Sequence, residues 1–105
     1  MTERAPLAEF LASNPPAPSQ WVRFHECVPR TKDRKTKVWA VATVTDSELG
    51  AVKFFPRWRC YAFFPAPACV FEEECLRDIA AFCEHQTAKW RVARNRARME
   101  RLARR

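Results

Sequence analysis

Long apolar runs are missing from this sequence. The chain has 105 residues and no stretch of about 18 apolar residues, so we expect no membrane-spanning helix. Near the first residue, Glu3 and Arg4 precede a short run that proline interrupts, which does not fit a secretory signal. The composition therefore predicts a small cytoplasmic protein with one hydrophobic core.

Paired metal ligands and catalytic constellations are missing as well. The five cysteines are irregularly spaced and include no C-x₂₋₄-C knuckle, so they predict neither a disulfide framework nor a zinc site. His25 with Cys27 and Cys83 with His85 are the nearest pairs of ligands, but on a helix residues 83 and 85 point about 200° apart. Each histidine has a glutamate beside it without a nucleophile at a known spacing. We expect no metal, no cofactor and no enzymatic activity.

Positive charge is concentrated at one end of the chain. Residues 86–105 hold eight basic residues against Glu100, a net charge of +7, while residues 1–20 and 21–85 have net charges of −1 and +1. A nearly neutral domain with a cationic end attracts polyanions, such as nucleic acid or an acidic protein surface. A membrane surface fits less well because the apolar side of this segment is mostly alanine. The alternative is a solubilising tail without a partner.

Residues 1–20 form a proline-rich arm. Residues 15–18 contain three prolines, which predicts an extended linker. Residues 5–12 are compatible with one or two helical turns. This arm either docks on the domain or a partner, or is a mobile terminus.

From Trp21 the apolar residues alternate, which predicts four strands. Prolines and polar clusters between the strands indicate short connections, and the connection over residues 30–37 is strongly basic. Short connections join antiparallel neighbours in a meander. The only glycine, Gly50, marks a bulge or a close backbone approach. The expected strands are Trp21–Val28, Val38–Thr45, Leu49–Phe55 and Trp58–Phe64.

After residue 72 the spacing becomes helical. Three glutamates occupy the first turn, where carboxylates complement the helix dipole. Leu76, Ile79, Ala80 and Cys83 then follow the i, i+3, i+4, i+7 rule and predict a face that packs on the sheet. No proline or glycine follows, so we expect the helix to continue and to project beyond the sheet. The predicted fold is an α+β domain over residues 21–85, with a four-stranded antiparallel sheet, one long C-terminal helix on one face, and a basic helical extension over residues 86–105.

One segment resembles a known group of proteins. Residues 48–65 read ELGAVKFFPRWRCYAFFP and are followed by CLRDI at residues 75–79. This pattern, L-G-x-[IV]-K, W-R-x-Y-x-F-x-P and C-L-x-[DE]-I, resembles small, mostly uncharacterised proteins encoded by bacteriophages and prophages. The resemblance implies a phage or prophage setting in a host cell and a similar fold, but no activity. The proline-rich start and the arginine-rich end depart from the pattern.

The fourth strand suggests a binding face. Period two places Arg59, Tyr61 and Phe63 on one face. If the helix covers the other face, these residues form an open row beside Lys53 or Phe54 on which unpaired bases can stack. The alternative is that Tyr61 and Phe63 are core residues, covered either by the N-terminal arm or by a second copy of the chain. In the second case the protein is a homodimer.

Two functional hypotheses follow from these features. The first is a non-enzymatic phage-type protein that binds nucleic acid through the basic helix and an aromatic, basic sheet face. The alternative is an inhibitor or modulator of a host enzyme or defence complex, bound through an acidic surface of the host protein. The candidate binding residues are Lys53, Arg57, Arg59, Tyr61, Phe63, Lys89, Trp90, Arg91, Arg94, Arg98 and Arg101.

Overall fold

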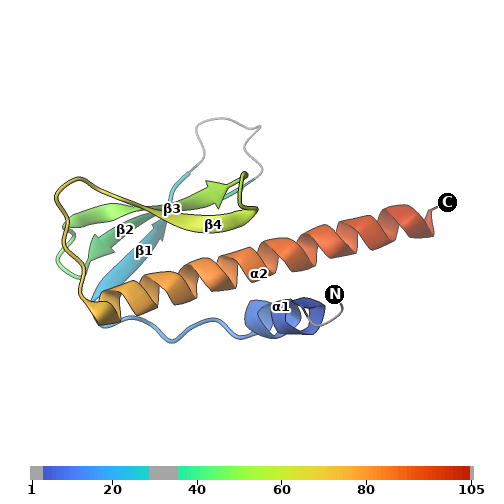
Figure 1. Cartoon of the computed structure of the whole chain (residues 1–105), viewed down its shortest axis with the longest axis horizontal. Helices are drawn as coiled ribbons and strands as arrows, with labels where there is room; N and C mark the ends of the chain where they lie inside the picture. Colours follow the sequence, from blue (N-terminus) through green and yellow to red (C-terminus); the bar gives the residue numbers. More distant parts are fainter. Residues whose placement is uncertain (1–3, 29–35, 105) are drawn as a thin grey trace.

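The computed structural model describes residues 4–28 and 36–104 of the chain, with side chains from residue 7 on. Most of the basic connection predicted over residues 30–37 lies outside the described residues. The predicted fold class is confirmed, with a four-stranded antiparallel sheet and a long C-terminal helix that packs against it (Figure 1). The elements are α1 (Arg4–Ser13), β1 (Val22–Glu26), β2 (Val38–Thr43), β3 (Glu48–Phe55), β4 (Cys60–Pro65) and α2 (Glu73–Ala103).

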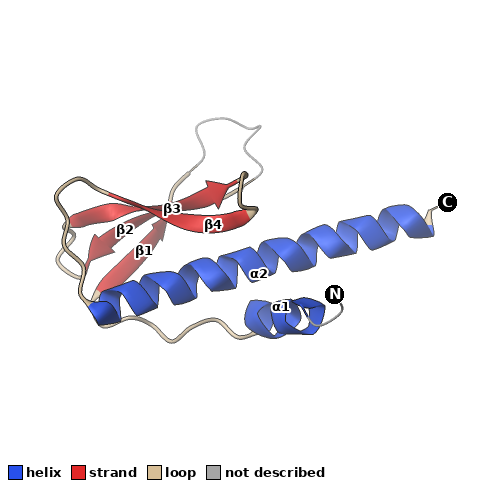
Figure 2. Cartoon of the chain, in the orientation of Figure 1, coloured by secondary structure: helices blue, strands red, loops and turns tan. Residues whose placement is uncertain are grey.

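The strands form a meander in the order β1-β2-β3-β4 (Figure 2). The register between β2 and β3 shifts between Val41 and Ala42, where Gly50 faces Val41. Gly50 has φ 150°, and a Cβ at this position would lie 2.3 Å from the carbonyl oxygen of Phe64 on β4. The single glycine thus lies beside a bulge and at a close backbone approach, as its place in the sequence predicts.

The core lies between one face of the sheet and α2. Val41 and Val52 are completely buried at its centre, and Ile79 of α2 packs among them. The rings of Phe24 on β1 and Phe82 on α2 are stacked with centroids 3.9 Å apart. Both helices lie on this side of the sheet in Figure 1. The fold therefore has two layers, and the second face of the sheet carries no helix of the described chain.

The predicted orientation of β4 is wrong. Tyr61 is only 8% exposed, and its ring contacts Trp39 and Phe54 in the core. Phe63 is partly buried and packs edge-on against Phe71. The pairing of β3 with β4 places Val52 beside Phe63, so all the large core residues of the sheet share this face. The alternative interpretation of Tyr61 and Phe63 as core residues is correct, although α2 covers them.

The anchored part of α2 extends further than the predicted boundary at residue 85. The backbone N–H of Tyr61 donates a hydrogen bond of 2.8 Å to the Oγ1 atom of Thr87, which is 6% exposed. Trp90 packs against Phe54 with ring centroids 4.7 Å apart. Because β4 is an edge strand, the Thr87 hydroxyl also satisfies a backbone group that no further strand can pair. Core contacts of α2 thus continue to Trp90.

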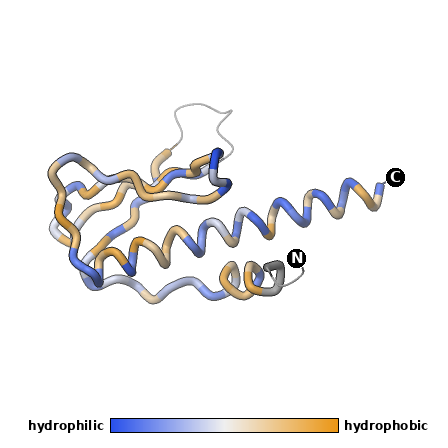
Figure 3. The backbone as a smooth tube through the Cα atoms, viewed as in Figure 1, coloured by the Kyte–Doolittle hydropathy of each residue, from blue (hydrophilic) through white to orange (hydrophobic). Residues whose placement is uncertain are grey.

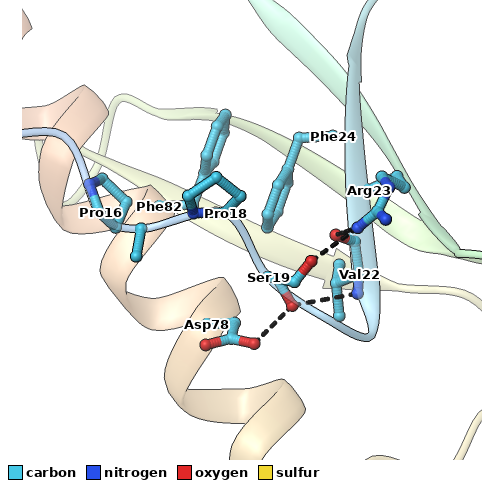
Figure 4. Close-up of a pocket in the computed structure, with 9 residues that line it drawn as sticks. Pro16, Pro18, Ser19, Val22, Arg23, Phe24, Asp78 and Phe82 are labelled. Atoms are coloured by element: carbon cyan, nitrogen blue, oxygen red, sulfur yellow. Dashed lines mark hydrogen bonds between the residues drawn. The ribbon is translucent and has the colours of Figure 1, made fainter.

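The N-terminal arm docks on α2. Figure 1 shows α1 antiparallel to α2, where Ala8 and Ala88 are buried and the Nδ1 atom of His85 lies 2.7 Å from the carbonyl oxygen of Leu11. Small side chains allow the two helices to approach closely. Figure 4 shows the linker passing along Phe82, with Ser19 hydrogen-bonded to Asp78 at the start of α2. Of the two alternatives for this arm, docking on the domain and a mobile terminus, the structure shows docking.

Within residues 4–28 and 36–104, neither helix is long and apolar enough to cross a membrane. This agrees with the expectation from the missing apolar runs.

Candidate nucleic-acid interface

The second half of α2 projects beyond the sheet. After Trp90 the helix continues to Ala103, and at a rise of about 1.5 Å per residue this part is about 20 Å long. Figure 3 shows that the hydrophobic colour of the first turns of α2 gives way to hydrophilic residues along this part. We call residues 91–104 the projecting half of α2. It gives the molecule its longest dimension of 52 Å.

The cationic side chains that the structure describes at this end of α2 are exposed, and none forms a salt bridge with another described residue. Seven of them are described, and Glu100 is the only acidic residue in the projecting half. Among the described residues the salt bridges are Lys37 with Glu26 and Arg77 with Glu73, and neither involves this set. The seven exposed cations are Lys89, Arg91, Arg94, Arg96, Arg98, Arg101 and Arg104.

Four of these arginines form a stripe. Arg91, Arg94, Arg98 and Arg101 are separated by three, four and three residues, which places them within a sector of about 80° on the helix. Along the axis they cover about 15 Å. The other cations lie outside this sector. We call these four residues the arginine stripe.

The connection between β3 and β4 adds two more exposed cations near the start of the projecting half. Residues 56–59 form a tight turn, in which Arg57 and Arg59 are exposed. Arg59 has φ 53°, in the left-handed region, and ends this turn. Its predicted place in a strand row with Tyr61 is therefore wrong, because the strand begins one residue later. Trp58 between them is 69% exposed.

An aromatic contact joins the sheet to the arginine stripe. Trp90 packs against Phe54 of β3, and the guanidinium of Arg94 lies 5.4 Å from the centroid of the Trp90 ring. Phe54 is close to the turn over residues 56–59, so the turn and the stripe lie at the same end of the sheet (Figure 1). Trp90 is one of the predicted binding residues, but the structure packs part of it against the core and places Arg94 over its ring.

Two partly or fully buried side chains near the arginine stripe, Cys83 and Tyr61, have raised pKa values. Burial, helped by the neighbouring Cys60, raises the pKa of the Cys83 thiol to about 11. Burial also raises the pKa of the Tyr61 phenol. Both groups are therefore protonated near neutral pH, and a thiol is a poor nucleophile in that form. Within the described residues no three histidine, cysteine or acidic side chains are grouped to hold a metal ion.

The structure brings six of the eleven predicted binding residues together, while Lys89 is exposed on another side of α2 and Trp90 is partly buried. Arg57, Arg59 and the arginine stripe gather at one end of the molecule, while Tyr61 and Phe63 are in the core. Lys53 lies on the sheet face away from α2, with its Nζ atom 4.4 Å from the centroid of the Phe64 ring. The predicted set lacks Trp58, which the structure exposes. The prolines and arginines around it indicate a turn, where an aromatic side chain has no core to enter.

Comparison with protein-family models, with curated proteins and with solved structures found no match for this chain. The resemblance to phage and prophage proteins therefore stays a prediction. The candidate interface rests on the exposed cations and on the aromatic residues beside them.

Proposed function

We propose that this protein binds nucleic acid through the arginine stripe of α2, in the phage or prophage setting that the sequence pattern indicates. The observation that supports this most is the set of seven exposed cations near the end of α2, none of which forms a salt bridge among the described residues. Unpaired arginines on one face of a helix are suited to phosphate groups, because each guanidinium can donate two parallel hydrogen bonds. The protein acts without catalysing a reaction.

The anchoring of α2 favours binding energetically. Thr87 and Trp90 fix the helix to the sheet immediately before the stripe begins. The backbone that carries the arginines is therefore already ordered, and only their side chains lose freedom on binding. Phosphate contacts of this kind are independent of base sequence and release bound counterions.

Salt dependence tests this function directly. Fluorescence anisotropy would measure binding to labelled single- and double-stranded oligonucleotides in increasing KCl. If the four arginines of the stripe contact phosphates, the affinity for duplex should fall about 100-fold between about 50 and about 200 mM salt. Absence of binding at low salt, or binding that does not respond to salt, would show that the proposal is wrong.

A charge-matched pair of variants separates the stripe from the net charge. The first variant changes Arg91, Arg94, Arg98 and Arg101 to Gln. The second changes Arg77, Lys89, Arg96 and Arg104 to Gln, so both lower the net charge of +7 by the same four units. We expect the first variant to lose most of the affinity and its salt dependence, and the second to lose several-fold less. Equal losses would contradict a role for the stripe.

A second candidate function has its own observation. Met99 and Leu102 are 66% and 51% exposed. At 3.6 residues per turn they lie on the same side of α2 as Ala88 and Val92, which lie beside α1. Cations flank this apolar line, so an acidic helix of a host protein fits it, as expected for an inhibitor or modulator of a host enzyme. A pull-down from nuclease-treated host lysate decides between the two: a retained stoichiometric protein favours the second function.

A further inference from the structure

The sheet face opposite α2 forms a shallow surface of small residues. The register places Ala40 beside Ala51, and Ala62 beside Lys53. These alanines are only partly buried, and no helix of the described chain lies on this side of the sheet (Figures 1 and 2). We call this the open face.

Three aromatic rings stand together at the end of the open face near the turn over residues 56–59. The ring of Trp58 meets the ring of Phe55 edge-on with centroids 4.7 Å apart, and Phe55 lies 6.2 Å from Phe64. In the pairing of β3 with β4, Ala62 lies between Phe55 and Phe64, and its small side chain leaves room for both rings. The Lys53 ammonium is placed over Phe64. We call these three rings the aromatic patch, in which Trp58 is exposed and Phe55 and Phe64 are partly buried.

We infer that the open face stacks the bases of a single-stranded nucleic acid on Trp58, Phe55 and Phe64. This inference rests on the proposed function and narrows its ligand to unpaired strands. Bases stack on aromatic side chains regardless of sequence because every base has a π-face, and each such contact changes affinity about 5- to 150-fold. In a duplex the faces of the bases are covered by their neighbours, so this patch is of use only for unpaired bases.

Charge favours nucleic acid over a second copy of the chain. Lys53 on the patch and Arg57 and Arg59 beside it are cationic and suit a phosphate backbone. Glu48 on the open face is at the far end of β3, about 23 Å away at about 3.3 Å per residue. Two copies that met through this patch would bring like charges together, which disfavours association.

The patch also connects to the arginine stripe. Consecutive strand residues point to opposite faces, so Phe55 reaches Trp58 while Phe54 packs on Trp90 beneath. A nucleic-acid strand that stacks on the patch can then cross the turn that holds Arg57 and Arg59. Beyond this turn it meets Arg94 on the other side of the sheet. One ligand can therefore use the stacking surface and the phosphate contacts together.

Replacement of Trp58 tests the inference. Anisotropy titrations would compare a labelled single-stranded oligonucleotide with the duplex of the same sequence. We expect Trp58→Ala to weaken single-strand binding by about 5-fold or more and to change duplex binding by less than about 2-fold. Trp58→Phe keeps a ring and should restore most of the affinity. Trp21→Ala is the matched control, because Trp21 is 50% exposed and its indole N–H bonds to Glu74 instead.

Each other result has a distinct meaning. Normal single-strand affinity in a folded Trp58→Ala protein overturns this inference and leaves the proposed function intact, provided that the stripe variant loses binding. Loss of oligonucleotide binding in every protein, the unmodified chain included, overturns both. A dimer in sedimentation experiments that Trp58→Ala dissociates, with unchanged affinity for oligonucleotides, assigns the open face to contact between copies and also overturns the inference.

Discussion

The hydrogen bond between Tyr61 and Thr87 gives the most direct test of how α2 is held. Thr87→Val keeps the shape of the side chain and removes its hydroxyl, so the backbone N–H of Tyr61 on the edge strand loses its acceptor. Thr87 is buried, and water reaches this position poorly. A buried donor without a partner costs about 1–3 kcal/mol. Taking about 2 kcal/mol, and a urea dependence of about 1.5 kcal/mol per molar, the midpoint should fall by about 1.3 M.

Thr87→Ser is the control for this measurement. Serine keeps the hydroxyl and removes one methyl group, so we expect a smaller loss of about 0.8 kcal/mol. Urea unfolding followed by far-UV circular dichroism would rank the unmodified protein first, serine second and valine last. Amide hydrogen exchange should show Tyr61 protected with threonine or serine, and faster with valine. If valine is as stable as threonine, or more stable than serine, the hydroxyl does not hold α2 to β4.

Three further predictions concern the fold. A chain that ends after Ala93 should stay folded and lose nucleic-acid binding, whereas one that ends after Glu84 also loses Trp90 and should melt more than about 10 °C lower by circular dichroism. Gly50→Ala forces a side chain against the backbone of β4 at φ 150°, so urea unfolding should show a loss of at least about 2 kcal/mol. The folded pKa of Cys83 is raised from 9.0 to about 11, so its contribution to stability is complete below pH 9 and disappears as the pH rises to about 11. Urea midpoints should therefore fall across this range, and less steeply in Cys83→Ala.

Local features of the sequence predict where α2 and the strands lie, but Leu76 and Ala80, which were expected on the packed face of α2, are exposed. Glu73 and Glu74 lie in the first turn of α2, and the side chain of Glu72 caps it by accepting a hydrogen bond from the Cys75 N–H. The predicted start near residue 72 depends only on such neighbours along the chain. The predicted start of β4 is two residues early, because Arg59 adopts a left-handed conformation that its residue type does not favour.

Which face of the sheet is buried does not follow from one strand. Period two correctly separates Tyr61 from Ala62, but both faces of β4 contain aromatic residues. The neighbouring strands decide which face is buried. Strand pairing places Val52 and Trp39 on the same side as Tyr61 and places alanines on the other side. The register that produces these pairs depends on the bulge beside Gly50. The prediction of an aromatic, basic face on the Tyr61 side of β4 is therefore wrong, and Lys53, Phe55 and Phe64 lie on the opposite face.

Docking of the N-terminal arm is equally hard to predict from composition. Its contact with α2 depends on Ala8 and Ala88, which are small and give little periodic signal. The decisive interactions come from residues far apart in sequence, such as Ser19 with Asp78 and Trp21 with Glu74. Such pairs become neighbours only once α2 lies on the sheet, so no local pattern indicates them.

The placement of charge and stacking at one end of the sheet has an energetic consequence. In the proposed function the arginine stripe and the open face each offer a weak, sequence-independent contact, and Phe54 and Phe55 connect the two through neighbouring positions of β3. Under this proposal, a nucleic-acid strand stacked on Trp58 is held at the end of the sheet where the stripe begins, so the second contact would form at a high effective concentration. The gain requires a rigid connection, because a mobile helix would have to be ordered at each binding event. In the proposed function, the extension of core contacts to Trp90 is therefore what would allow the two weak surfaces to act as one site.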